Sequence, residues 1–312
     1  MKWIKKGFIC SKDSFKLDWF KKNTMVPLPY LINDDTIRIF ITMCDEKNIG
    51  RIGYVDVDAN NPSKIKGYSK TPLIDIGFDG TFDDNGCVTA SLLKDGDKLY
   101  MYYSGYQLCV KVPYLIFTGL AVSYDNGNSF KKLTTEVPVL DRVEGEMANR
   151  CVPFVIKEGD IYKMWYTASV NDGWVDAPIG KKEPLYNLKY MESNDPTKWE
   201  AKAGKTVIDF KNTDEHGICK SVLWKEDGLY KIIYSLRHLS KGYRLGYGES
   251  KDGINWNRMD DKIGITISEK PAFDDDMVCF AERLVYKDKV YLFYSGNHYG
   301  MDGIGYAELE SK

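Results

Sequence analysis

The sequence has no strong excess of charge and no long apolar run. Its 312 residues carry 43 Lys and Arg against 45 Asp and Glu, so the formal net charge is −2. This balance argues against a nucleic-acid surface or an anionic membrane as the partner. No apolar stretch approaches the roughly 20 residues of a membrane-spanning helix, and the first residues lack the apolar core of a signal peptide. We therefore expect a cytoplasmic protein with neither a membrane nor a nucleic acid as its partner.

Histidine is scarce, and the cysteines are poorly spaced for metals or disulfides. The seven cysteines are an odd number at wide intervals, and no Cys-x-x-Cys pair occurs. This pattern disfavours a zinc site and a disulfide framework alike, so we expect all seven to be reduced. The three histidines, His216, His238 and His298, do not have the spacing of metal ligands. We expect no cofactor, with a central Ca²⁺ ion as the alternative.

What the sequence does contain is one degenerate unit in five copies. Each copy has an apolar strand, a short polar turn, a second strand that closes on Ser or Thr, and a third strand rich in Gly and Tyr. Regular internal repeats of this kind are typical of propellers. The closing hydroxyl residues lie 60 to 68 residues apart, at Thr42, Ser104, Thr167, Ser235 and Ser295. The sequence therefore predicts an all-β, five-bladed β-propeller with four antiparallel strands in each blade.

The fifth copy ends at Lys312, just after its third strand. Trp3 occupies the position that Phe130, Trp199 and Trp256 fill at the start of the fourth strand elsewhere. We predict that residues 1–9 join the C-terminal blade, because closing the ring removes an exposed sheet edge. The chain is then a single domain, 1–312, whose blades cover approximately 24–70, 82–140, 146–210, 215–268, and 275–309 together with 1–9.

One face of this propeller is predicted to carry the functional residues. The turns between first and second strands are tight, whereas the loops between second and third strands are long and irregular. Functional residues concentrate on loops that a rigid scaffold holds, so we place the site at the central depression of the long-loop face. These loops cover residues 43–50, 105–118, 168–187, 236–243 and 296–302.

Acidic residues precede the innermost strands in four of the five copies. In the first copy the matching segment is taken to be the apolar run Pro27-Leu28-Pro29-Tyr30. Carboxylates that converge on the axis, with cations among them, would have pKa values split in the way that acid–base catalysis needs. The alternative for each acid is a role in a turn or a cap. The candidate catalytic acids are Asp83, Asp84, Glu146, Glu215 and Asp275.

These features together resemble the five-bladed propeller glycoside hydrolases. Family 43, the family 32 catalytic domain and the family 130 mannoside phosphorylases share the Tyr-Ser second strands, the inner-strand carboxylates and the Ser-x-Asp-Gly-x-x-Trp turn. The chain is more closely similar to glucosyl hydrolase-like proteins of bacterial surface-polysaccharide biosynthesis. The segments that carry this likeness are Phe82-Asp83-Asp84-Asn85-Gly86, Gly119-Leu120-Ala121-Val122-Ser123 and Gly296-Asn297-His298-Tyr299-Gly300.

The resemblance implies a glycoside hydrolase that acts on a small sugar, a nucleotide-sugar or a glycan intermediate. Families 43 and 32 place a catalytic Asp on the first blade, where this chain has none. If the chemistry is retained, the corresponding acids of this chain would therefore be offset by one blade. Asp84 would activate water, with Asp83 as the other candidate, and Glu215 would protonate the leaving oxygen. Glu146 and Asp275 would set the pKa of that acid.

Eight further residues are candidates for substrate binding. Aromatic side chains in the loops would stack on sugar rings, and polar side chains would bind hydroxyls or a phosphate; packing over the blade edge is the alternative for the aromatic ones. The set is Arg150, His216, Lys220, Arg283, His298, Tyr299, Trp174 and Tyr106.

Two other functions stay open. In a phosphorylase or transglycosylase, Arg150, Lys220, Arg237 and Arg283 would hold a phosphate or an anionic donor. A propeller that binds a glycan or a protein without catalysis is the third, because a fold does not dictate its chemistry.

Overall fold

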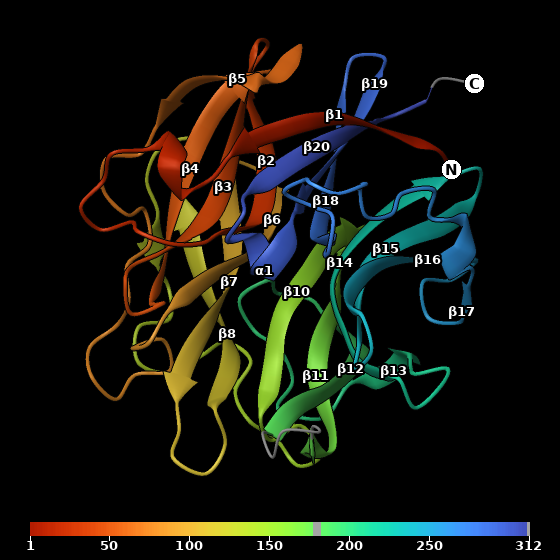
Figure 1. The fold of residues 1–312 in the computed structure, drawn as a ribbon. Helices are drawn as coiled ribbons and strands as arrows, with labels where there is room; N and C mark the ends of the chain where they lie inside the picture. The colour runs from red at the N-terminus through yellow and green to blue at the C-terminus, as the bar shows by residue number, and fades with distance from the viewer. Residues whose placement is uncertain (177–181, 311–312) are drawn as a thin grey trace.

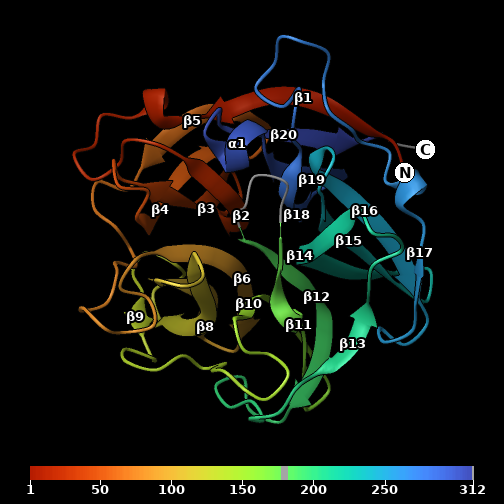
Figure 2. The same cartoon turned by 60° about the horizontal axis from the view of Figure 1, so that its bottom comes forward.

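The computed structural model describes residues 1–176 and 182–310, which form five four-stranded antiparallel blades around a central axis (Figures 1 and 2). The strands of the first two blades are β2 (Thr24–Asn33), β3 (Thr36–Cys44), β4 (Gly50–Asp58) and β5 (Asn61–Tyr68), then β6 (Cys87–Asp95), β7 (Lys98–Leu108), β8 (Tyr114–Ser123) and β9 (Lys131–Lys132). Those of the third and fourth are β10 (Asn149–Glu158), β11 (Ile161–Asp176), β12 (Lys182–Ser193) and β13 (Lys205–Ile208), then β14 (Glu215–Glu226), β15 (Leu229–His238), β16 (Gly242–Ser250) and β17 (Trp256–Arg258).

The fifth blade is built from both ends of the chain. Strands β18 (Cys279–Tyr286), β19 (Lys289–Ser295) and β20 (Ile304–Leu309) are followed in the sheet by β1 (Trp3–Cys10). Strand β1 pairs antiparallel with β20, from Trp3 opposite Leu309 to Cys10 opposite Ile304. Figure 1 shows β1 lying beside β20 across the top of the molecule. The predicted closure of the ring by the N-terminal strand is confirmed.

The innermost strands form the wall of the axis, and apolar clusters fill the spaces between blades. Strands β2, β6, β10, β14 and β18 each contact the next one around the ring, and β18 contacts β2. A separate buried cluster spans each of the interfaces between neighbouring blades; the one that closes the ring joins Ile39 and Ile41 of the first blade to Phe293 and Tyr306 of the fifth. Burial of apolar surface between blades is therefore the main force that holds the ring together.

The closing hydroxyl of each second strand reaches across to the innermost strand of the following blade. In four blades the side-chain oxygen accepts a hydrogen bond from a buried backbone N–H, and in the third blade Thr167 Oγ1 instead donates to the Ile218 carbonyl at 3.5 Å. The four acceptor pairs are Thr42 with Thr89 (3.0 Å), Ser104 with Val152 (3.0 Å), Ser235 with Phe280 (2.7 Å) and Ser295 with Val26 (3.0 Å).

A β-bulge in each innermost strand makes these N–H groups available. The register of β2 with β3 shifts between Met25 and Leu28, and the other innermost strands shift at the matching point. Val26 and Val152 have φ values of 54° and 40° there, a left-handed conformation that is costly for a β-branched residue. The bulge turns the N–H out of its own ladder, and the neighbouring hydroxyl satisfies it.

The turns and hairpins differ between the two faces. The tight turns between first and second strands are confirmed. The prediction of irregular loops at 105–118 and 168–187 is wrong, because β7 continues to Leu108 and β11 to Asp176 as long hairpin strands. In residues 1–176 and 182–310, helical structure is limited to α1 (Asn297–Gly300) and two 3₁₀ turns, η1 (Lys12–Ser14) and η2 (Asp260–Lys262). Among the residues described, none forms a helix long and apolar enough to cross a membrane.

We predict that Ser295→Ala lowers the free energy of unfolding by about 1–3 kcal/mol, because it leaves the buried Val26 N–H without an acceptor at the closing interface. Chemical denaturation measures the difference. Thr135→Ala, which removes an exposed hydroxyl that makes no hydrogen bond within the described structure, is the control and is expected to change stability by less than about 0.5 kcal/mol. Equal stability of the two variants would contradict a role for the hydroxyl in joining the blades.

Candidate functional site

A pocket of about 920 Å³ lies at the centre of the ring. All five innermost strands contribute to its lining, through Val26, Val88, Val152, Cys219 and Phe280. Its walls are the hairpins between second and third strands, so it opens on the face predicted to carry the site, which Figure 2 turns toward the viewer. This volume is that of a small-molecule site.

Aromatic side chains form one side of the pocket. Tyr106 and Tyr114 come from the β7–β8 hairpin and lie 5.4 Å apart between ring centroids. Tyr243 packs edge-on against Tyr299 at 6.0 Å, and its hydroxyl is hydrogen-bonded to that of Tyr186. Burial raises the pKa of the Tyr106, Tyr186 and Tyr243 phenols well above its usual value. These rings are therefore neutral surfaces that also carry hydroxyl groups.

Arg237, at the end of β15, is the cation deepest in this wall. Its guanidinium forms an ion pair with Glu183 at 2.8 Å and donates a hydrogen bond to the Tyr299 hydroxyl at 3.0 Å. Burial by itself lowers the pKa of Arg237, but its polar surroundings, with the Glu183 carboxylate among them, raise it above its usual value on balance. Arg237 is thus a permanent positive charge held in a fixed orientation.

The pocket lining is positively charged, in contrast to the chain as a whole. Among the described residues, its charged members are Lys47, Lys111, Lys182 and Arg237 against a single carboxylate, Glu183. The net charge of the whole chain is −2. The excess of cations is therefore local, and it favours an anionic ligand.

Two buried amides add unused hydrogen-bonding capacity. Asn23 and Asn149 line the pocket and are 9% and 1% exposed, and the side-chain oxygen of each has no partner within the described structure. An unpaired buried acceptor costs free energy, so such groups normally meet a partner. Both side chains belong to the polar part of the lining.

Cysteines also line the pocket but are not activated. Cys151 and Cys219 are buried in its floor, and burial raises the pKa of Cys219 to about 11. The thiolate is the nucleophilic form of cysteine, and a thiol with this pKa stays protonated at neutral pH. All seven cysteines of the chain are free.

The predicted catalytic acids lie elsewhere, inside the blades. In the second blade, Asp83 is fully buried, accepts a hydrogen bond from Tyr103 at 3.0 Å, and pairs with Lys132 of β9 at 2.6 Å. In the third, Glu146 pairs with Arg150 at 2.7 Å. The tyrosine is the residue just before the closing Ser or Thr.

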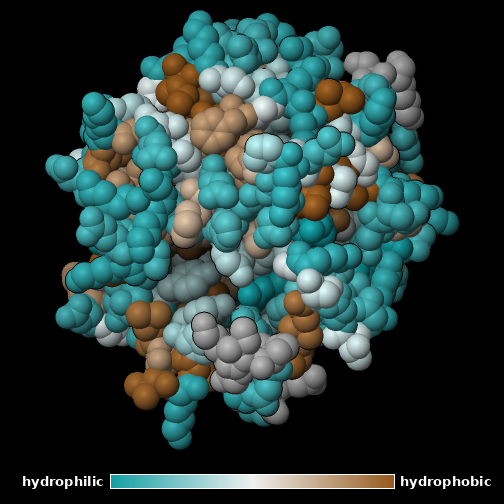
Figure 3. All heavy atoms as spheres, in the orientation of Figure 1, coloured by the Kyte–Doolittle hydropathy of each residue, from teal (hydrophilic) through white to brown (hydrophobic). Residues whose placement is uncertain are grey.

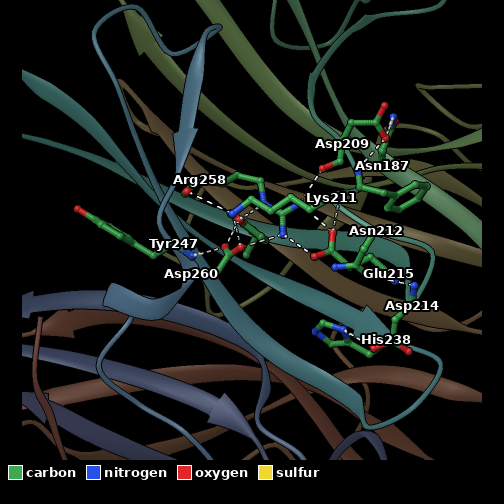
Figure 4. Close-up of polar contacts among 12 residues, drawn as sticks. Asn187, Asp209, Lys211, Asn212, Asp214, Glu215, His238, Tyr247, Arg258 and Asp260 are labelled. Atoms are coloured by element: carbon green, nitrogen blue, oxygen red, sulfur yellow. Dashed lines mark hydrogen bonds and ion pairs between the residues drawn. The ribbon is translucent and has the colours of Figure 1, made fainter.

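The fourth and fifth blades repeat this arrangement. Glu215 forms an ion pair with Arg258 at 2.8 Å, which Figure 4 shows in close-up. Arg258 also donates a hydrogen bond to the Tyr234 hydroxyl. In the fifth blade the acid is Asp274, which bonds Tyr294 at 2.9 Å and Lys5 of β1 at 2.6 Å. Each acid thus ties the start of an innermost strand to its own blade.

The first blade replaces this network with apolar packing. Counting back from the bulge, Phe20 occupies the position of the acid and Ile41 that of the tyrosine, and both belong to one buried cluster. Pro27-Leu28-Pro29-Tyr30 lies within β2, beyond the bulge. The prediction that this segment matches the acids of the other copies is wrong. Strand β2 begins at Thr24, before the apolar run, and the position that matches the acids is Phe20.

The two remaining acids differ from these. Asp84 accepts a hydrogen bond from the Gly80 N–H at 2.8 Å, and its other oxygen is buried without a partner in the described structure. Asp275 accepts from the Ala272 N–H at 2.8 Å, which with the Asn297 contact lowers its pKa. None of the five predicted acids lines the central pocket. The expectation that they converge on the axis is therefore wrong, and a catalytic role for them stays a prediction.

Of the eight predicted substrate-binding residues, the structure brings Tyr106 and Tyr299 to the pocket. Trp174 packs edge-on against Tyr114 at 5.6 Å, just outside the lining. The others lie in the scaffold or at the surface. Three of them have acidic partners: Arg150 pairs with Glu146, Lys220 with Glu282 and His298 with Asp302. The guanidinium of Arg283 lies over the ring of Trp224. His216 is buried, and its pKa is lowered to about 4 by burial and by Arg237.

Sequence reasoning missed most of the pocket. Glu183, Tyr186 and Tyr243 begin or precede the third strands, a part of the unit that varies between copies and so gave no repeat signal. Asn23 and Asn149 lie where the innermost strands begin, beside the acids that drew attention. Among the described residues, no group of three or more His, Cys, Asp or Glu side chains is placed to hold a metal ion.

The fold is a five-bladed β-propeller with a pocket at its centre. No family model matches the chain. The chain belongs to the same protein family as the uncharacterized proteins MT1551 and Rv1502 of Mycobacterium tuberculosis, strains CDC 1551 and H37Rv. Each is 31% identical to it over 311 residues, which cover 100% of both proteins.

Solved structures share the fold at lower identity. A glycoside hydrolase superposes with a TM-score of 0.72 at 16% identity, covering 99% of this chain and 92% of its own. A complex of BT0996 and RGII has a TM-score of 0.72 at 17% identity, covering 99% and 91%. A third structure comes from work on the family 130 mannoside phosphorylases, a family described as containing hydrolases that target β-1,2 mannosidic linkages. It has a TM-score of 0.68 at 15% identity and covers 99% of this chain and 90% of its own. These likenesses concern the fold alone.

We predict that Glu146→Gln lowers the free energy of unfolding by about 3–5 kcal/mol, because it leaves Arg150 buried without its ion-pair partner. Glu144→Gln, on the same segment but exposed, is the matched control and is expected to be neutral. Denaturant titration of both variants measures the effect. A Glu146→Gln variant as stable as the wild type would argue against a structural role for this acid.

Proposed function

We propose that the protein binds an anionic carbohydrate, one that carries a phosphate or a carboxylate, in the central pocket. The observation that carries this proposal is the charge of the pocket lining. Its cations, Lys47, Lys111, Lys182 and Arg237, are balanced only in part by Glu183 in the lining and by Asp176, which pairs with Lys182. Arg237 offers a planar guanidinium for a phosphate or carboxylate oxygen pair.

The aromatic wall supports the carbohydrate part of the ligand. A sugar ring has apolar C–H faces and hydroxyl edges, and a tyrosine offers both an apolar ring and a hydroxyl. Tyr106, Tyr243 and Tyr299 provide the rings. The side chains of Asn23 and Asn149, which line the pocket, add polar groups beside these rings. The fold that this chain shares with glycoside hydrolases is consistent with a sugar ligand, although it does not fix one.

Hydrolysis by two carboxylates is supported less well. That chemistry needs one carboxyl to protonate the leaving oxygen and another to activate water or attack the sugar. Asp83, Glu146 and Glu215 are each held by a cation inside a blade. The described lining supplies one carboxylate instead of two.

Phosphorolysis is the second candidate, and the single carboxylate favours it. A phosphate oxygen would form the bond to the anomeric carbon, and the glycosidic C–O bond would break. Glu183, released from Arg237 by the incoming phosphate and protonated from water, would give its proton to the leaving oxygen. Phosphate brings its own nucleophile, so no second carboxylate is required. Arg237, 2.8 Å from Glu183, would hold the phosphate beside that acid.

We predict that Arg237→Gln weakens binding of sugar phosphates and uronic acids by tenfold or more, because a hydrogen bond to a charged group contributes about 1.5–3 kcal/mol. Calorimetric titration with a panel of sugar 1-phosphates and uronic acids, each beside its neutral sugar, measures this. Arg142→Gln, an exposed arginine outside the lining, is the control. Equal affinity for charged and neutral sugars, or no binding by the wild type, would contradict the proposal.

For phosphorolysis, we expect release of sugar 1-phosphate from a glycoside panel to require inorganic phosphate and to fall by about 10²–10⁴ in Glu183→Gln. Glu192→Gln, an exposed glutamate at the other end of β12, is the control. Turnover at the same rate without phosphate would indicate hydrolysis, and no turnover under either condition would leave binding as the function.

A further inference from the structure

The hairpin that joins β7 to β8 projects an apolar tip beside the mouth of the pocket. Its strands remain paired out to Leu108 opposite Tyr114, and the Cys109 N–H bonds to the Pro113 carbonyl at 3.3 Å. The tip reads Leu-Cys-Val-Lys-Val-Pro over residues 108–113, all of which border the pocket. Leu108 is 64% exposed and Val110 is fully exposed. An apolar tip on a well-paired hairpin has no partner within the described chain.

Other exposed apolar side chains lie on the same face. Single exposed hydrophobic residues are normal on a protein surface, whereas a gathering of them marks an interaction site. Figure 3 shows hydrophobic residues at the lower left of the molecule, over the β7–β8 hairpin. Further exposed members on the hairpin loops or strand starts of this face are Met147, Leu239, Tyr299 and Met301.

Aromatic contacts hold the hairpin in place. Tyr114 at its base packs against Tyr106 at 5.4 Å and against Trp174 of β11 at 5.6 Å. Trp and Tyr are the residues that favour the boundary between water and lipid. A hairpin that is already ordered loses little conformational entropy when it docks.

Lysines accompany the apolar tip. Lys111 is at the tip itself and Lys47 is on the β3–β4 loop, and neither has an acidic partner within the described structure. Lys182, on the neighbouring β11–β12 hairpin, is paired with Asp176. Lysine can bury its stem along an apolar surface and keep its ammonium group in the polar layer. Apolar residues flanked by lysines suit an interface of acyl chains covered by anionic headgroups.

We propose that the pocket-bearing face docks on an anionic lipid bilayer through the β7–β8 hairpin. Because residues 108–113 also line the pocket, docking through this hairpin sets the mouth of the pocket against the headgroup layer. If the proposed function holds, the ligand is then the carbohydrate part of a membrane-anchored anionic glycan. The near-neutral charge of the whole chain predicts no membrane partner, but the local arrangement of apolar tip and lysines points to one.

The test is co-sedimentation of the full chain with vesicles of phosphatidylcholine alone and of phosphatidylcholine and phosphatidylglycerol in a 7:3 ratio, without any glycan. We expect the wild type to bind the anionic vesicles and to bind neutral ones at least tenfold less. Val110→Asp is expected to lower binding to anionic vesicles by tenfold or more, and Lys111→Gln by about fivefold. Val285→Asp, 50% exposed at a turn of the opposite face, is the control and should bind as the wild type does.

The outcomes separate this proposal from the proposed function. No binding of the wild type to anionic vesicles overturns docking, whatever the sugar titrations give. Equal loss in Val110→Asp and Val285→Asp overturns the assignment to the hairpin. A dimer that Val110→Asp dissociates, without vesicle binding, would identify a second copy of the chain as the occupant and also overturn it. Arg237→Gln should lose anionic sugars yet keep vesicle binding, because Arg237 is only 14% exposed by its side chain and lies away from the tip.

Discussion

The hydrogen bond between the closing hydroxyl of one blade and a bulged backbone amide of the next is the constraint on which the rest of the structure depends. Because the bulge falls at the same point of each innermost strand, every blade meets its neighbour at the same height on the axis. The residues at the bulges, such as Val26, Val152 and Phe280, are also the floor of the pocket. The interaction that joins the blades therefore also shapes the ligand site, and a change to either affects the other.

This chain shares the fold of glycoside hydrolases, and its buried acids lie inside the blades, outside the lining of the central pocket. Four acids, Asp83, Glu146, Glu215 and Asp274, are each paired within the blade with a cation of the fourth strand or of their own strand. All of them except Glu215 also accept a hydrogen bond from a tyrosine. A buried carboxylate needs such partners, because burying an unpaired charge is costly. An acid satisfied in this way gives order to the start of an innermost strand. The walls of the pocket are formed instead by hairpin residues that differ between the copies, such as Tyr106, Glu183 and Tyr243.

The sequence predicts the fold well because the repeat is local. The Tyr-Ser or Tyr-Thr pair that ends a second strand can be recognised from the sequence alone. Trp3 matches the residue that starts the fourth strands closely enough to predict the closed ring. The direction of a side chain is not local, since it depends on pairing and bulges that no spacing reveals. Glu146 and Asp274 precede their strands as catalytic acids would, yet they point into their own blades. For the same reason Phe20 could not be recognised as the apolar replacement of an acid before the pairing of β2 was known.

The features that suggest function are those in which one blade departs from the others. The β7–β8 and β11–β12 hairpins are longer than their counterparts, and they bring Tyr106, Tyr114 and Glu183 to the pocket together with the apolar tip at Leu108 and Val110. A repeat that only needed to fold would gain nothing from these extensions, since exposed apolar residues and unpaired amides such as Asn149 are unfavourable in the free protein. Both costs are offset if a ligand fills the pocket while the tip is buried. A single partner that presents a sugar and an acyl surface side by side would satisfy the two together.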